Sequence, residues 1–300
     1  MAQEMATKEE RTWLLYPEDP ARRVGVRIER PGDALEEGAA ERPVVVLSHG
    51  FKGFMDWGFF PMLSTRLARA GFVVVSFNAS GSGIGDDPMV MDDEEAFLRD
   101  TYTRQLEDIA RVRAWARRLE GVDAGREALM GHSRGGGMSI VAAAEDPPAA
   151  LVTWAAIDES DRFDDATKAH WRAEGELRVP NGRTGQVHRM SVAALDDFEE
   201  HRERLDIVAA AGRYPGPFLA IHGSKDGTVP PSAATRLAAA APGGSALILE
   251  GADHAFDAKH PMGEVSPEAL ERAIAATLDH LAPLAEPPRG TASPARPQVN

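Results

Sequence analysis

The sequence contains no cysteine among its 300 residues, which excludes disulfides, thiolate zinc sites and cysteine nucleophiles. No apolar run approaches the length of about 18 residues that a membrane-spanning helix needs, so we expect no membrane partner. Basic side chains are also in deficit, because 33 Lys and Arg stand against 47 Asp and Glu, for a net charge of −14. Nucleic-acid binders usually carry a basic face, so this balance argues against such a partner.

The length and composition permit one large domain, since 43% of the 300 residues are hydrophobic and can form a sizeable core. The first twenty residues are charged and lack the apolar segment of a signal peptide, so we expect a cytoplasmic location. Residues 1–10 are predicted to be a frayed terminus. We predict a single domain over residues 1–285 and a disordered, proline-rich tail over residues 286–300.

The most informative stretch is Gly131-His132-Ser133-Arg134-Gly135. The apolar run 128–130 before it is typical of the end of a strand, and residues 138–144 after it are typical of a helix. A serine between glycines at a strand-to-helix turn is the pattern of a nucleophile elbow. Glycines prevent side-chain collisions in this strained turn, and the helix N-terminus favours developing negative charge. We therefore predict that Ser133 is a nucleophile.

Continuous apolar runs elsewhere predict strands that are buried on both faces. These runs cover residues 43–47, 72–77, 151–157, 218–221 and 246–249, and two shorter strands are expected at 12–16 and 24–28. Helical patterns at 61–70, 94–119, 232–241 and 267–281 lie between or after them. The alternation predicts an α/β fold with a doubly wound, mostly parallel sheet, whose site lies beyond the carboxyl ends of its strands.

A serine nucleophile needs a base, and the base needs an orienting acid. His254, in the loop after the last strand, is the candidate base. Asp226, in a turn after the strand at 218–221, is the candidate acid, which gives the chain order Ser, Asp, His. Asp253 is the alternative acid, but it directly precedes the histidine and would have difficulty reaching its Nδ1 atom.

The oxyanion of such a reaction needs backbone N–H donors. We predict that Arg134, just after the serine, supplies one and that Phe51 supplies the other, because Gly50 lets the backbone approach closely. The remaining histidines at strand ends or in the elbow are explained by packing and backbone hydrogen bonds: His49, His132 and His222.

Two other patterns are weaker. The run Gly81-Ser82-Gly83-Ile84-Gly85 does not have the spacing of a dinucleotide loop, and acidic residues follow it, so no cofactor is predicted. Four possible metal ligands lie close together without the spacing of a zinc motif, so no metal is predicted. These residues are His188, Asp196, Asp197 and His201.

Four motifs together resemble the α/β-hydrolase superfamily: His49-Gly50-Phe51, the glycine-rich run at 131–136, the segment 222–230 around Asp226, and Gly251 with His254. The resemblance covers about residues 40–283 and is nearest to the serine esterase branch of cinnamoyl/feruloyl esterases and dienelactone-hydrolase-like proteins. Dienelactone hydrolases proper have a cysteine nucleophile, from which this chain departs.

The resemblance implies hydrolysis of small-molecule carboxylic esters through an acyl-enzyme. Ser133 would be the nucleophile, His254 the base and Asp226 its orienter, with the amides of Phe51 and Arg134 as the oxyanion hole. In feruloyl-type esterases a cap follows the strand after the elbow, and the charged segment 158–204 occupies that place. An acylpeptide-type peptidase, a thioesterase and a catalytically silent binding protein are the alternatives, and a homodimer is left open.

Overall fold

The structure, a computed structural model, describes residues 6–181 and 185–286. Its strands are β1 Thr7–Tyr16, β2 Asp19–Pro31, β3 Arg42–Ser48, β4 Val73–Asn78, β5 Val122–His132, β6 Ala150–Trp154, β7 Glu176–Pro180, β8 Val187–Ser191, β9 Pro217–Gly223 and β10 Gly243–Leu249. Its helices are α1 Phe60–Arg69, α2 Glu94–Leu98, α3 Tyr102–Ala116, α4 Arg134–Glu145, α5 Asp165–Glu174, α6 Ala193–Glu200, α7 Ile207–Arg213, α8 Ser232–Ala240 and α9 Glu268–Ala285.

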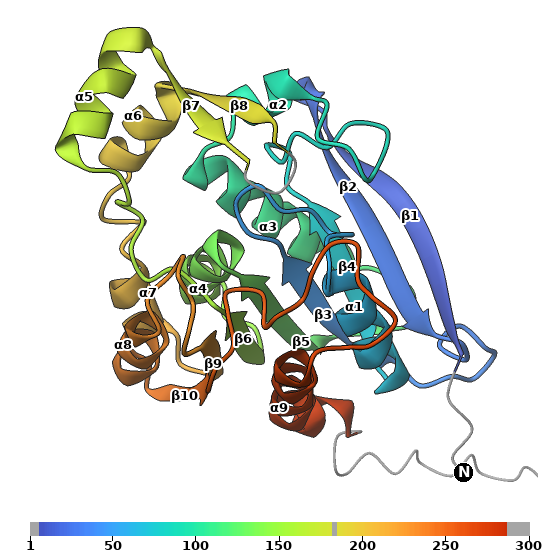
Figure 1. Cartoon of the computed structure of the whole chain (residues 1–300). Helices are drawn as coiled ribbons and strands as arrows, with labels where there is room; N and C mark the ends of the chain where they lie inside the picture. The colour runs from blue at the N-terminus through green and yellow to red at the C-terminus, as the bar shows by residue number, and fades with distance from the viewer. Residues whose placement is uncertain (1–5, 182–184, 287–300) are drawn as a thin grey trace, which may run out of the picture.

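Eight strands form one sheet in the order β1, β2, β4, β3, β5, β6, β9, β10 (Figure 1). Strand β2 is antiparallel to both β1 and β4, whereas all neighbours from β4 to β10 are parallel. The valines at 44–46 and 73–75, in the centre of the sheet, are fully buried, as expected of strands covered on both faces. The predicted α/β class and mostly parallel sheet are confirmed.

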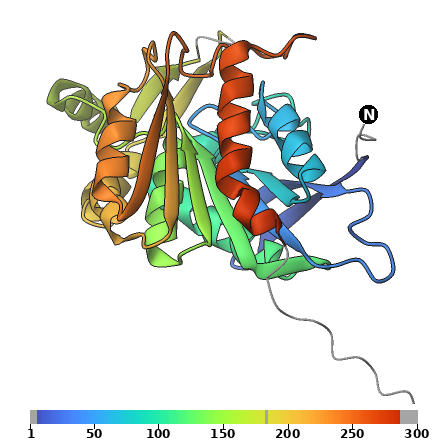
Figure 2. The same cartoon turned by 90° about the horizontal axis from the view of Figure 1, so that it is seen from below.

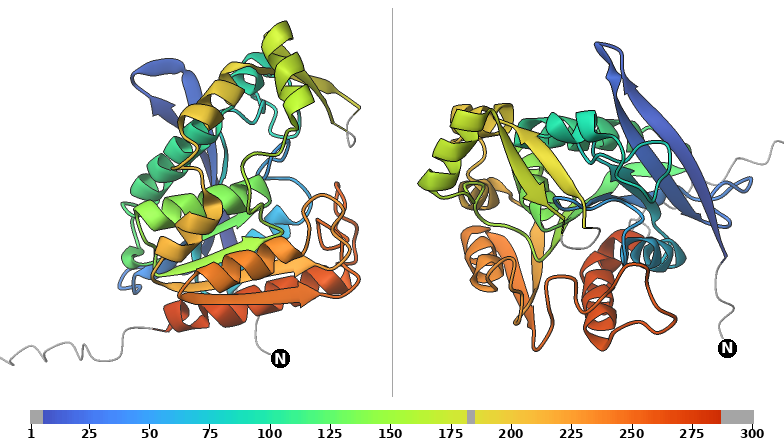
Figure 3. Two further views of the ribbon diagram at one scale, coloured as in Figure 1. Left: turned by 90° about the vertical axis from the view of Figure 1, so that its left-hand side faces the viewer. Right: turned by 45° about the horizontal axis from the view of Figure 1, so that its top comes forward.

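Helices cover both faces of this sheet (Figures 2 and 3). Helices α1 and α9 pack together on one face, and α3, α4, α7 and α8 pack side by side on the other. The sheet is therefore doubly wound. Since parallel strands end at a common edge, the loops after β3, β5, β9 and β10 lie together there, and these loops carry the predicted site residues.

Residues 158–181 and 185–204, in the first part of the segment between β6 and β9, rise from the same edge as a separate layer (Figure 1). It contains α5, an antiparallel pair of strands β7 and β8 outside the main sheet, and α6. Apolar side chains on its inner side, such as Trp171, Leu195 and Phe198, are almost completely buried. This layer lies where the sequence predicted a cap insertion, and we refer to it as the cap; its action as a cap over a substrate stays a prediction.

Two expectations about the ends of elements were wrong, and one helix was not expected. Strand β1 begins at Thr7 and pairs with β2 along its length, so residues 7–10 are not frayed. Their side chains are mostly charged and exposed, so the sequence lacks the alternation of apolar and polar residues that predicts a strand. Their backbone is nevertheless paired with β2. Helix α7 was not expected, and α9 continues past residue 281 to Ala285. Of the predicted tail, residues 287–300 lie outside the described part of the chain.

Candidate active site

Ser133 lies between the end of β5 and the start of α4, with φ 55° and ψ −123°. A positive φ is rare for a residue with a side chain, and it persists here because the surroundings leave no alternative. A Cβ atom on Gly135 would lie 2.2 Å from the carbonyl oxygen of His49, and one on Gly131 would lie 2.3 Å from that of Gly135. The two glycines are therefore required for the turn that presents Ser133.

The loop after β3 lies directly against this turn. A Cβ atom on Gly50 would come within 2.8 Å of Cβ of Ser133, so only glycine permits the contact. Phe51 directly follows Gly50 in this loop, and Phe51 and Ser133 line the same cavity. Arg134 is the first residue of α4, and the N–H groups of the first helical turn have no partner within the helix. The two predicted oxyanion donors thus flank Ser133 on different elements.

The structure brings Asp226 and His254 together. Nδ1 of His254 lies 2.7 Å from Oδ2 of the buried Asp226 carboxylate. The other carboxylate oxygen, Oδ1, accepts hydrogen bonds from the amides of Thr228 and Val229 at 2.8 and 2.9 Å. The alternative acid, Asp253, is exposed and binds amides of its own loop, so the structure places Asp226 against the imidazole.

The Asp226 carboxylate has a further partner that the sequence did not indicate. Nε2 of His222 lies 3.0 Å from Oδ2, and both side chains are completely buried. Burial by itself would raise the pKa of Asp226, but hydrogen bonds from His222 and His254, the charge of His254 and the Val229 amide hold this pKa well below its usual range. The acid therefore remains a carboxylate at neutral pH.

His132 and His49 hold the loops of the site. Nε2 of His132 lies 2.9 Å from the carbonyl oxygen of His254, and the two rings are 4.8 Å apart. Nε2 of His49 accepts the amide of Ala79 at 3.0 Å, while its Nδ1 lies 2.8 Å from the Gly50 carbonyl oxygen. These contacts agree with the packing roles expected from the sequence.

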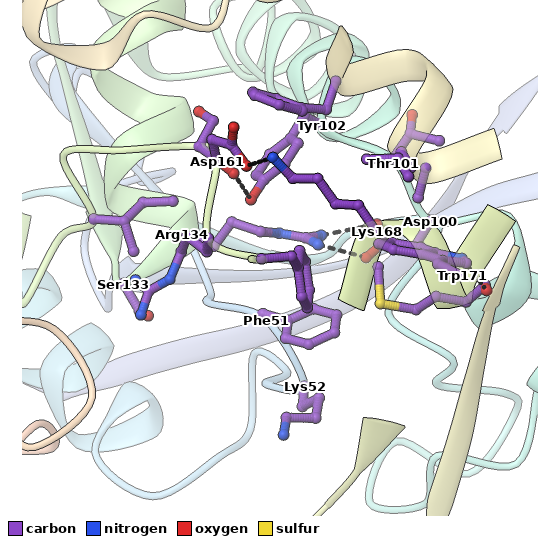
Figure 4. A pocket seen from close by; sticks show the side chains of 18 of the residues that line it. Phe51, Lys52, Asp100, Thr101, Tyr102, Ser133, Arg134, Asp161, Lys168 and Trp171 are labelled. Atoms are coloured by element: carbon purple, nitrogen blue, oxygen red, sulfur yellow. Dashed lines mark hydrogen bonds and ion pairs between the residues drawn. The ribbon is translucent and has the colours of Figure 1, made fainter. Parts of the chain in front are cut away.

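Ser133 and His254 open onto a cavity of about 340 Å³ between the sheet edge and the cap. The cap contributes the greater part of its apolar wall, and Trp171 is one of these side chains (Figure 4). The apolar residues of the cap that line the cavity are Phe163, Trp171, Met190, Ala194, Leu195 and Phe198. Several hydrogen bonds hold the cap onto the body around this cavity. Among them, Arg162 donates to the Thr228 carbonyl oxygen at 2.8 Å, and Lys52 donates to that of Pro180 at 2.9 Å.

The guanidinium of Arg134 lies in the wall of this cavity (Figure 4). It binds both carboxylate oxygens of Asp100, at 2.6 and 2.8 Å, and Oε1 of Gln105 at 2.8 Å. Burial would lower the pKa of Arg134, but the Asp100 charge raises it above the ordinary value, so the group stays cationic. Its contact with the ring of Phe51, 5.0 Å to the centroid, links the loop after β3 to the start of α4.

The candidate metal ligands are engaged in structural contacts. Asp197 accepts the Thr103 hydroxyl, and His188 stacks on Phe97 at 4.6 Å. Among the described residues no group of three or more His, Asp or Glu side chains is arranged to hold a metal ion.

In the glycine-rich run at 81–85, the glycines make room for carboxylates, because a Cβ on Gly81 would lie 2.6 Å from Asp100 Oδ1. Within the same residues, none of the helices combines the length and apolar character needed to cross a bilayer.

The fold and the arrangement at its carboxyl edge define an α/β-hydrolase. The resemblance drawn from the four sequence motifs is thereby confirmed at the level of this superfamily. Residues 57–263 match the prolyl oligopeptidase family, and the chain belongs to that family.

An uncharacterised 31.7 kDa protein from the traX-finO intergenic region of Escherichia coli is 34% identical over 112 residues. That alignment covers 37% of this chain and 36% of the relative, so it spans about a third of the relative's length.

Solved structures share the fold at low identity. Est1E from Butyrivibrio proteoclasticus, determined with ferulic acid bound, superposes with a TM-score of 0.66 and 19% identity over 88% of this chain and 96% of its own. The esterase domain of a Rhodothermus marinus protein superposes with a TM-score of 0.61 and 18% identity, over 92% of this chain and 98% of its own. Mouse alpha/beta hydrolase domain-containing protein 10 superposes with a TM-score of 0.63 and 17% identity, over 92% of this chain and 99% of its own. Together these comparisons support a hydrolase of the α/β fold.

Proposed function

We propose that the protein is a serine esterase that cleaves small-molecule carboxylic esters through an acyl-enzyme. In this proposal Ser133 is the nucleophile, His254 the general base and Asp226 its orienting acid, and the amides of Phe51 and Arg134 form the oxyanion hole. The observation that carries the proposal is the strained Ser133 turn, which shares one cavity with a histidine held by a buried carboxylate. No metal or cofactor takes part in it.

The acylation step follows from the arrangement of the three side chains. Asp226 accepts the Nδ1 hydrogen of His254, so the Nε2 atom of that ring is unprotonated and can take the serine proton. Oγ of Ser133 attacks the ester carbonyl, and its proton passes to Nε2. The tetrahedral intermediate then expels the alcohol, which receives that proton. Water repeats the sequence to release the acid.

The oxyanion of each tetrahedral intermediate lies beside the N-terminus of α4. Backbone donors fixed before the reaction stabilise this charge without reorganisation, and losing one such donor costs about 10²–10³ in rate. The Phe51 and Arg134 amides suit this role because Gly50 and the elbow glycines bring both backbones close to Ser133. The cap excludes water from the cavity, which strengthens the interaction.

A fluorophosphonate probe and an ester panel test the proposal. Wild-type protein should be labelled at Ser133 and should hydrolyse at least one acyl ester. Ser133→Ala should keep its melting temperature, resist labelling and lose at least about 10³-fold in kcat/KM. An unlabelled but folded wild-type protein would instead be a silent hydrolase-fold binding protein. The panel should include hydroxycinnamate esters, since Est1E has been seen with ferulic acid.

Peptide hydrolysis is the second candidate, because the chain belongs to the prolyl oligopeptidase family. The same triad cleaves amides when the leaving amine is protonated by the histidine. Ester, thioester and peptidyl-amide substrates with one shared acyl group separate the candidates. Preferential cleavage of the amide, after allowance for its lower intrinsic reactivity, would favour a peptidase over an esterase, and preferential thioester cleavage would favour a thioesterase.

A further inference from the structure

A second and larger cavity, of about 690 Å³, adjoins the first at His254. The two cavities share three lining residues, Lys52, Thr228 and His254, but Ser133 lines only the first. The volume is within the range of pockets that bind small organic molecules. A molecule bonded to Ser133 and extending past the imidazole would pass from one cavity into the other.

Segments remote in the sequence form the walls of the second cavity, and three of them contribute most of its side chains. The loop between β4 and α2 contributes Met89, Val90 and Met91, the loop after β3 contributes Phe54 and Trp57, and the segment after His254 contributes Ala258, Lys259 and His260. One wall is held by aromatic contacts and a hydrogen bond. The His260 ring stacks on Trp57 and meets Phe54 edge-on at 5.3 Å, and its Nδ1 accepts the Gly58 amide at 3.0 Å.

One wall of this cavity is apolar although the cavity is open to solvent, whereas the side shared with His254 carries polar groups such as Lys52 and Asp253. Among the exposed large hydrophobic side chains of the described residues, Met89 is 49% and Val90 is 40% exposed, and both line it. Val187, which is 54% exposed, directly follows Gln186, whose side-chain amide donates to the carbonyl oxygen of Met91 on the same wall at 3.2 Å. Exposed apolar groups that gather in one place usually mark a surface that binds something.

The chemistry of the proposed reaction assigns an occupant. When the tetrahedral intermediate collapses, the bond between the carbonyl carbon and the alcohol oxygen breaks, and the proton on Nε2 of His254 passes to that oxygen. The alcohol must therefore leave on the side of the imidazole, whereas the acyl group stays on Ser133. The cavity that contains Ser133 suits the acyl group, and the cavity beyond His254 suits the leaving group.

We infer that the second cavity binds the leaving group of the substrate and that this group is a bulky, apolar alcohol. The inference rests on the proposed function and adds to it a substrate class. Val90 is the position to alter, because it lies on the apolar wall and is far enough exposed to be replaced without disturbing the core. Val265, which is 85% exposed and lines neither cavity, supplies the matched control.

The test keeps one acyl group and varies the alcohol from ethanol to hexanol and 2-(2-naphthyl)ethanol, which are primary alcohols of similar leaving ability. For the wild type, kcat/KM should rise along the series. Val90→Asp should lower kcat/KM for the naphthylethyl ester on the order of tenfold relative to the ethyl ester, because a carboxylate disfavours apolar contact. Val265→Asp should leave the series unchanged.

Deacylation supplies the second readout. All esters of the series give the same acyl-enzyme, so single-turnover measurements should yield one deacylation rate constant, unchanged in Val90→Asp. A flat alcohol series, equal effects of the two variants, or a changed deacylation rate would overturn the assignment while Ser133 still reacts with the fluorophosphonate probe. Loss of the probe reaction in the folded wild type would instead overturn the proposed function.

Discussion

The Nε2 atom of His222 lies 3.0 Å from Oδ2 of Asp226, inside a completely buried contact. The same nitrogen lies 3.0 Å from the carbonyl oxygen of Val229. Both neighbours are acceptors, so Nε2 carries the hydrogen and His222 donates to the carboxylate. Asp226 therefore receives hydrogen bonds from two histidines and two backbone amides, which fixes its direction toward His254.

We expect His222 to be a positioning residue. His222→Phe should lower kcat by roughly 10- to 100-fold, the usual effect of removing a partner that orients a functional group, with little change in KM. His222→Gln keeps an N–H donor near the carboxylate and should restore much of the loss. Steady-state kinetics and thermal melts of both variants check this. If the two variants lose equal activity in proportion to lost stability, His222 serves only packing.

The identity of the orienting acid can be tested by two matched substitutions. Asp226→Asn should lower kcat by about 10⁴-fold, because the amide favours the wrong imidazole tautomer. Asp253→Asn should stay within about twofold of the wild type, since Asp253 caps the amides of Ala255 and Asp257 instead. Steady-state kinetics at neutral pH decide between them. The reverse pattern, with a crippled Asp253 variant and an active Asp226 variant, would assign the acid to Asp253.

The elbow and the strand ends were predictable from the sequence because their signals are local. Ser133 lies between glycines at a change from strand to helix pattern, and Asp226 and His254 each follow an apolar run. The Arg134 ion pair with Asp100 was not predictable, since 34 residues separate the partners and only packing brings them together. Likewise, β1 is paired through its backbone, which charged side chains such as Glu9 and Glu10 do not reveal.

We expect the buried His49 to make the free energy of unfolding depend on pH. Burial lowers the pKa of His49 from its ordinary value of 6.5 to about 4, and the positive charge of Arg134 adds to this effect. Between these values the unfolded chain binds a proton that the folded chain does not, so stability rises with pH. The contribution is fully present above pH 6.5 and is lost as pH falls toward 4, by about 3 kcal/mol in all.

Urea unfolding between pH 4.5 and 7 measures this dependence. His49→Gln can still accept the Ala79 amide and donate to the Gly50 carbonyl, but it does not titrate. The free energy of unfolding of this variant should therefore vary less with pH than that of the wild type over the same range. Identical slopes for the two proteins would show that His49 does not carry the effect.

The acyl side of the site can be tested on helix α6 of the cap. Ala194 is buried and lines the cavity that contains Ser133, whereas the preceding residue, Ala193, is exposed. Ala194→Leu adds three carbons to the cavity wall and should lower kcat/KM for long or aromatic acyl groups on the order of tenfold, with acetyl esters little affected. Ala193→Leu makes the same change outside the cavity and should match the wild type in every ester.

This variant should show the opposite kinetic pattern to the one expected of Val90→Asp. The acyl group remains on Ser133 after the alcohol has left, so Ala194→Leu should slow deacylation of bulky acyl-enzymes as well as their formation. Varying the alcohol at a fixed acyl group should leave the ratio of variant to wild-type kcat/KM constant. If that ratio instead followed the alcohol and ignored the acyl chain length, the cap would contact the leaving group, and the two cavities would have to exchange their assigned occupants.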